Sequence, residues 1–149
     1  MTVLLLTGCV SVAERNSEES AAFLLANRQA AGVVETTAGL QYRVIRSGSG
    51  CHPTPESTVT VHYETRRVGH FAPVDSSYRR REPGVYPLPK MIGGWRQGIP
   101  EMRVGAKWEF FVPPALGYGE EGWGPVEPNE VLVFIVELLD AEPCSGVAP

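Results

Sequence analysis

Four stretches of the chain have the hydrophobic pattern of β-strands, with apolar side chains that alternate with polar ones or β-formers in short runs. They are residues 40–45, 58–63, 106–112 and 131–139. Segments rich in Gly, Pro and Ser, at 47–57 and 113–128, separate them and predict loops. The pattern therefore predicts an antiparallel sheet built from short strands.

A crude helical repeat precedes the strands, in residues 18–31. Ser17 or Ser20 is suited to cap this helix, and Gly32 is suited to end it. A helix of this length is not stable alone in water. It must therefore pack on the domain, pack on a second copy of the chain, or fray. The polar residues 10–20 are expected to form a tether.

A second helical repeat lies between the predicted strands and consists of Met91, Ile92, Trp95, Ile99 and Met102. Pro100 is tolerated only near a helix end, so this helix is expected to be short or bent. One helix lying across an antiparallel sheet defines an α+β fold class.

Composition narrows the functional classes. The 149 residues are 43% hydrophobic and 20% charged, which is ordinary for a globular domain. The net charge of −4 argues against nucleic acid as the main partner, because phosphate binding needs a basic face. No run of apolar residues is long enough for an ordinary membrane span. The three cysteines show no zinc-type spacing, so no metal is expected.

The chain begins with an apolar run that ends in Leu6-Thr7-Gly8-Cys9. This segment resembles a bacterial lipoprotein signal. Residues 1–9 are therefore expected to be a truncated signal with Cys9 as the lipidated residue, and residues 10–36 a tether and short helix. No Lys or Arg precedes Arg15, so either the true start lies upstream or the match is accidental. The first alternative predicts a lipid anchor on the periplasmic face of a bacterial envelope; the second, a frayed cytoplasmic N-terminus.

Five further motifs occur in a fixed order: VTVHY at 59–63, VDSS at 74–77, MIGGW at 91–95, PALGYG at 114–119 and LVFIVEL at 132–138. Together they resemble the motif set of the FKBP-type peptidyl-prolyl cis-trans isomerases, over residues 37–142. FLLAN at 23–27 and GLQY at 39–42 resemble the Mip and periplasmic subgroup, which carries a helical N-terminal extension. The resemblance implies a bent antiparallel β-sheet wrapped around one short α-helix, followed by a tail at 143–149.

The resemblance also implies a site in which a substrate proline sits in an apolar aromatic cup, with Trp95 as its floor. The residues expected to act in catalysis are Tyr63, Asp75, Trp95, Tyr118 and Phe134. Those expected to bind substrate are Val74, Tyr86, Met91, Ile92 and Val126. Val74 departs from the family pattern, which has an aromatic or large apolar residue there. The arginines at 79–81 are expected to form a solvated loop.

Such a cup suits rotation about an X-Pro bond. The barrier of roughly 18–20 kcal/mol comes from amide resonance, which the twisted imide has lost. A dry apolar site favours the twisted form over the planar one, and this difference is what catalysis requires. No cofactor is needed. The expected partners are proline-containing segments of exported proteins, with macrolides as inhibitors, and the chain is expected to be a monomer or a weak dimer through its N-terminal helix.

Two alternative functions stay open at this point. A chaperone or adaptor could grip proline-containing segments with weak or no turnover, and a structural lipoprotein could merely tether a partner. The strands that pair antiparallel in the family would also bring Cys51 and Cys144 to the same end of the sheet. A disulfide is then geometrically feasible, and an oxidising periplasm would permit it; otherwise both are unpaired thiols.

Overall fold

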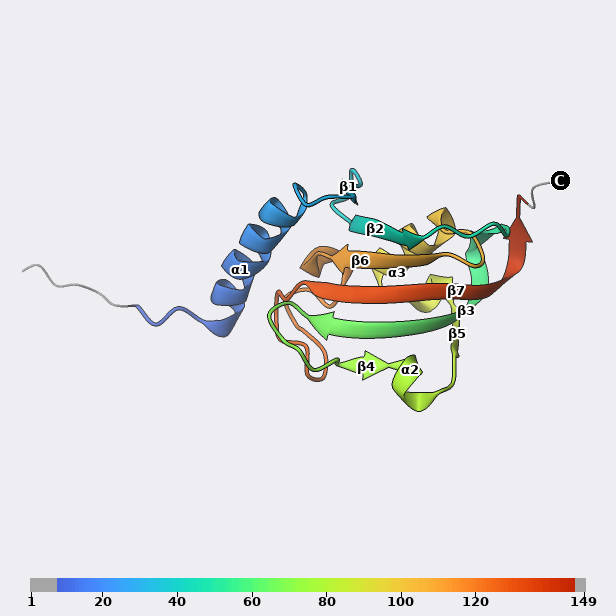
Figure 1. The fold of residues 1–149 in the computed structure, drawn as a ribbon. Helices are drawn as coiled ribbons and strands as arrows, with labels where there is room; N and C mark the ends of the chain where they lie inside the picture. Colours follow the sequence, from blue (N-terminus) through green and yellow to red (C-terminus); the bar gives the residue numbers. More distant parts are fainter. Residues whose placement is uncertain (1–7, 147–149) are drawn as a thin grey trace, which may run out of the picture.

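Seven β-strands form one antiparallel sheet in the computed structural model, which describes residues 8–146 (Figure 1). The strands are β1 (Val33–Glu35), β2 (Gln41–Arg46), β3 (His52–Arg67), β4 (Asp75–Ser76), β5 (Gly84–Pro87), β6 (Lys107–Val112) and β7 (Leu132–Ser145). Their order is β1-β2-β6-β7-β3-β4. β5 pairs with β3 along the same edge as β4, opposite the edge that pairs with β7. The predicted α+β class, with an antiparallel sheet, is confirmed.

The helices are α1 (Val12–Asn27), α2 (Ser77–Arg80) and α3 (Gly93–Gly98), and single 3-10 turns occupy Leu88–Lys90, Ile99–Glu101 and Pro114–Leu116. In Figure 1, α3 lies across one face of the sheet, whereas α1 stands at the end where β3 stops and β7 starts. The predicted helix at 91–102 is thus an α-helical turn and a half followed by a 3-10 turn. Pro100 sits at the start of that turn, where its missing N–H leaves no hydrogen bond unmade.

β3 and β7 form the centre of the sheet and pair along most of their length. Their register shifts between Pro53 and Thr58 and again between Thr60 and Val61. Such irregularities bend a strand and increase its twist, which lets the sheet curve around α3. The helix approaches closely because three of its residues are glycines: a Cβ at Gly94 would stand 2.8 Å from both methyl carbons of Val112.

α1 begins six residues earlier than the sequence pattern predicted. Ser11 Oγ accepts a hydrogen bond from the Glu14 N–H at 3.2 Å, and the Glu14 carboxylate accepts one from the Ser11 N–H at 2.9 Å. This reciprocal capping box, and not Ser17 or Ser20, starts the helix. The expected tether over 10–20 is therefore mostly helical. None of the helices within residues 8–146 has the length and apolarity to cross a bilayer.

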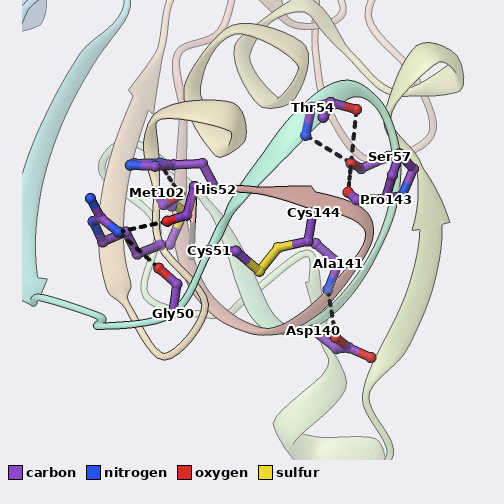
Figure 2. Close-up of a disulfide and its surroundings, with 12 residues drawn as sticks. Gly50, Cys51, His52, Thr54, Ser57, Met102, Asp140, Ala141, Pro143 and Cys144 are labelled. Carbon is purple, nitrogen blue, oxygen red and sulfur yellow. Dashed lines mark hydrogen bonds between the residues drawn. A yellow bond between two sulfur atoms is a disulfide. The ribbon is translucent and has the colours of Figure 1, made fainter. Parts of the chain in front are cut away.

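The end of the sheet farthest from α1 is closed by a covalent bond. Cys51, just before β3, and Cys144, near the end of β7, form a disulfide with their Cα atoms 5.6 Å apart (Figure 2). Cys9 is exposed and free. Residues 1–7, which include most of the apolar run before Cys9, lie outside the described part of the chain. The lipidation of Cys9 therefore stays a prediction.

Candidate active site

An aromatic cavity of about 250 Å³ opens between α3, the inner face of β3 and β7, and the long loop 117–131. Its lining consists of Tyr63, Thr65, Val74, Asp75, Tyr86, Met91, Ile92, Trp95, Tyr118, Trp123, Val126 and Phe134. All ten residues that the sequence assigned to catalysis or substrate binding are therefore neighbours in one hollow. Thr65 and Trp123 complete the lining without having been assigned. The individual roles of these residues stay predictions.

Trp95 forms the floor of the cavity. It is only 2% exposed, because α3 presses it against the sheet. The rings of Tyr63, Tyr86 and Phe134 stand edge-to-face to it, with centroid distances of 5.5, 5.7 and 5.7 Å. Edge-to-face pairs are favoured by the ring quadrupoles, so the four rings hold one another in a fixed box. The indole N–H of Trp95 is buried without a hydrogen-bond partner among residues 8–146, and such unpaired buried groups are few in native folds.

A polar network closes one wall of this box. The Tyr63 hydroxyl donates to the Asp75 carboxylate and accepts hydrogen bonds from Arg80 at 3.0 Å and from the Tyr86 hydroxyl at 3.1 Å. Arg80 also forms an ion pair with Asp75. Ser76 positions the Asp75 carboxylate, because its N–H donates a hydrogen bond to that carboxylate at 2.8 Å. The Ser76 side chain caps the N-terminus of α2.

The network fixes the charges at the wall. Burial raises the pKa of the Tyr63 phenol, and its hydrogen bond to Asp75 acts in the same direction. Burial alone would raise the pKa of Asp75, but hydrogen bonds from Tyr63 and Arg80 outweigh it and hold that pKa below its ordinary 3.8. At neutral pH the phenol is therefore neutral and the carboxylate ionised.

Arg80 was missed by the sequence analysis, which assigned residues 79–81 to a solvated loop. The arginines are indeed exposed, but Arg79 and Arg80 lie on α2, and only Arg80 turns to the site. The sequence feature that could have identified Arg80 is its position five residues after Asp75, with the start of a helix between the two residues. The neighbouring arginines concealed that signal, because a run of like charges usually marks a solvated surface.

The mouth of the cavity is formed by loop 117–131. Tyr118 and Trp123 stack at 5.5 Å with an angle of 19° between their planes. A two-residue hairpin holds the tryptophan, since Trp123 and Val126 exchange both backbone hydrogen bonds at 2.9 Å. Burial, and then the negative charge of Asp75, raise the pKa of Tyr118. Its hydroxyl makes no hydrogen bond to another residue within 8–146, so it is free to donate to a ligand.

Two departures from an all-aromatic cavity shape the remaining walls. Val74 fills less of its side of the cavity than an aromatic ring would. Thr65 adds a hydroxyl beside Phe134, with which it is paired across β3 and β7.

Ile92 is the N-cap of α3: its carbonyl accepts from the N–H groups of Trp95 and Arg96, both at 3.1 Å. This places its own N–H at the start of the helix, beside the floor of the cavity.

Comparison with known proteins agrees with this geometry. Residues 50–139 match the family model of the FKBP-type peptidyl-prolyl cis-trans isomerases, and residues 10–44 match the model of the domain amino-terminal to them. The chain therefore belongs to the FKBP-type peptidyl-prolyl cis-trans isomerase family.

Its relatives are of the Mip and FkpA kinds. It is 44% identical to the peptidyl-prolyl cis-trans isomerase Mip of Coxiella burnetii, over 85% of this chain and 55% of that protein. It is 43% identical to the isomerase FkpA of Aeromonas hydrophila, over 87% of this chain and 48% of that protein. The chain thus spans about half the length of these curated relatives. The crystal structure of FkpA from Escherichia coli superposes with a TM-score of 0.84 at 34% identity, covering 88% of this chain and 61% of that one.

Proposed function

We propose that the protein is a peptidyl-prolyl cis-trans isomerase that accelerates X-Pro rotation in exported proteins. The observation that carries this proposal is the convergence of Tyr63, Tyr86, Trp95 and Phe134 on one cavity of about 250 Å³. That volume lies just below the roughly 300–1,000 Å³ of sites for drug-sized ligands, and it suits a single small ring. The names of the relatives favour turnover over the alternative of a proline-binding module without activity.

The mechanism follows from the polarity of the cavity. A planar X-Pro imide carries resonance charge on its carbonyl oxygen, which an apolar box solvates poorly. The half-rotated imide has lost that charge separation and gains relative to the planar form. The hydroxyl of Tyr118 and the N–H of Ile92 are donors at the edge of the box, where they can hold the flanking carbonyls of the peptide. Each tenfold acceleration requires about 1.36 kcal/mol of such differential binding.

The proposal is tested with a peptide whose X-Pro bond starts in the cis form, with catalysed relaxation compared to the uncatalysed rate. Trp95→Leu removes the floor of the cavity and should abolish most of the acceleration. Trp108→Leu is the matched control: it makes the same change in another buried tryptophan, which stacks on Tyr42 outside the cavity. Equal losses in the two variants, or an inactive wild type, would rule out this site as the catalyst.

The cellular setting is a further part of the proposal. A relative that is 37% identical over 131 residues is named outer membrane protein MIP of Legionella longbeachae. This name supports a place in the bacterial envelope, and lipidation of Cys9 would anchor the protein at its periplasmic face. Metabolic labelling with a fatty acid, in cells that express the natural gene, should mark the wild type and not Cys9→Ser. Equal labelling of both would refute the anchor.

Inhibitor binding and oligomeric state complete the proposal. We expect a macrolide to place one ring-sized group in the apolar cavity, and isothermal titration would detect this binding. α1 uses one side to contact its own domain, as in the ring contact between Phe23 and Phe111 at 6.0 Å, and leaves Leu25 exposed. We therefore expect a monomer, or a weak dimer through the outer face of α1. Sedimentation of the wild type and of Leu25→Ser distinguishes the two.

A further inference from the structure

α1 contacts the pocket loop through polar side chains. Asn16 Nδ2 donates to the Glu127 carboxylate at 3.2 Å and to the Pro128 carbonyl at 3.0 Å. Ser20 Oγ donates to the carbonyl of Asn129 at 2.6 Å. Asn16 and Ser20 are four residues apart and therefore lie on the same face of the helix. They are only 6% and 8% exposed, which is unusual for polar residues on a helix outside the main core.

The contact is reciprocal at Asn129. The side-chain amide of this residue donates to the Ala13 carbonyl at 3.1 Å, in the first turn of α1. Its backbone has a φ of 61°, in the left-handed region that residues other than glycine rarely adopt. Its N–H donates to the Gly119 carbonyl at 2.8 Å. Asn129 thus links the helix on one side to the start of the loop on the other.

The anchored segment is the one that bears the mouth of the cavity. Trp123 and Val126 lie in the stretch that the Asn129–Gly119 hydrogen bond closes, and Tyr118 immediately precedes it. The N–H of Gly122 donates to the Tyr118 carbonyl at 3.1 Å, and the hairpin at Trp123 follows directly. Hydrogen bonds therefore link the buried face of α1 to the loop backbone that carries the Tyr118 and Trp123 rings.

We propose that α1 is a brace for the active site, with Asn16 and Ser20 as positioning residues that hold loop 117–131 in its working conformation. The inference rests on the proposed isomerase function and assigns to the helix a part in it. Loops that carry binding residues are ordinarily the mobile part of a fold. Here the loop is fixed from outside the isomerase domain, so any partner that displaces α1 would loosen the mouth of the cavity.

The full chain offers a matched comparison. Asn16→Ala with Ser20→Ala removes the hydrogen bonds that these two side chains donate to the loop. Asn27→Ala removes a hydrogen bond of 2.8 Å at the other end of α1, which goes to Gln41 on β2 and not to the loop. The two readouts are kcat/KM on a cis X-Pro peptide and amide hydrogen exchange, followed separately for residues 117–131 and for β6 and β7.

In the double variant we expect kcat/KM to fall roughly tenfold, because small misplacements of positioning groups are costly in catalysis. Exchange should accelerate at the amides of Trp123, Val126 and Asn129 and stay unchanged in β6 and β7. Asn27→Ala should show neither effect. The single change Ser20→Ala, which removes one hydrogen bond, gives the same comparison on a milder scale if the double variant does not fold.

The brace is refuted if either readout of the double variant stays at the level of the Asn27→Ala control. It is also refuted if exchange accelerates equally in β6 and β7, since the helix would then stabilise the whole domain and not the loop. An inactive wild type would refute the proposed function. In that case the exchange data alone would decide whether α1 holds the loop.

Discussion

Removal of the Cys51–Cys144 disulfide should destabilise the protein strongly while sparing the active site. The two cysteines are 93 residues apart in the chain, so the bond closes a loop that includes most of the domain. In the chain-entropy model, a loop of this length stabilises the fold by about 4.6 kcal/mol at 25 °C, through the freedom that it denies to the unfolded chain. The variant Cys51→Ser/Cys144→Ser loses this contribution.

The native contacts around the bond should survive its loss. The Ser57 hydroxyl donates to the Pro143 carbonyl, and His52 Nδ1 lies 2.8 Å from the Met102 carbonyl oxygen, so this end of the sheet has its own hydrogen bonds (Figure 2). The cavity lies toward the other end of β3, where Thr65 pairs with Phe134. The expected change is therefore in the unfolded state and not in the site.

The assay is a thermal melt followed by circular dichroism, with Cys9→Ser as the control because that thiol is exposed and free. For a chain of this size each kcal/mol corresponds to about 3 °C, so Tm should fall by roughly 14 °C. Reductant should lower the Tm of the wild type similarly and leave the double variant unchanged. At low temperature kcat/KM should match the wild type. A Tm within about 3 °C of the wild type would refute the entropic reasoning.

Four further predictions concern the cavity wall. Tyr118→Phe should lower kcat/KM roughly tenfold, the equivalent of one hydrogen bond of about 1.4 kcal/mol, and leave Tm unchanged because the hydroxyl makes no hydrogen bond to another residue of the described part of the chain. Arg80→Ala should raise the pKa of Asp75 in an NMR titration, because Arg80 helps to lower it. Because folding lowers the pKa of Asp75, its carboxylate stabilises the fold at pH values above the ordinary pKa of 3.8. This stabilisation is lost as the pH falls through the lower pKa of the folded state. The free energy of unfolding of Asp75→Asn, measured with urea, should therefore change less with pH in acid than that of the wild type. Val74→Phe should tighten proline-peptide or macrolide binding roughly fivefold in isothermal titration, through the added apolar contact of about 1 kcal/mol. An unchanged kcat/KM in Tyr118→Phe, pKa in Arg80→Ala, pH dependence in Asp75→Asn or affinity in Val74→Phe would contradict the corresponding prediction.

Four of the seven strands were predictable in kind but not in length, whereas the short strands β1, β4 and β5 were not predicted. The interiors of those four follow a two-residue period, whereas their ends depend on partners that are distant in the chain. β3 starts at His52, six residues before the predicted strand, and includes Pro53 and Pro55, which in sequence indicate a loop. The β3–β7 pairing lapses between Pro53 and Thr58, so Pro55 is tolerated there. β7 likewise continues past residue 139 to Ser145, beyond its apolar stretch.

The cavity was predictable because the motifs that define it are local. Each motif contributes one to three side chains from a strand, turn or helix start, and the family resemblance supplies their common arrangement. Arg80 and Thr65 have no such local signature, because what brings them to the cavity is the pairing of β3 with β4 and β7. Trp123 was not assigned to the site, because its stacking on Tyr118 depends on the hairpin geometry of the loop.

α1 was placed too late in the sequence for the same reason that it can brace the active site. A search for apolar periodicity passes over the first turns of this helix, because the face that packs on the loop carries Asn16 and Ser20 where a core helix would carry aliphatic residues. These polar side chains satisfy loop carbonyls that would otherwise be buried without partners. Aliphatic residues at these positions would strengthen the helical pattern and leave the loop unanchored. The capping-box residues Ser11 and Glu14 were the one local signal that marked the true start.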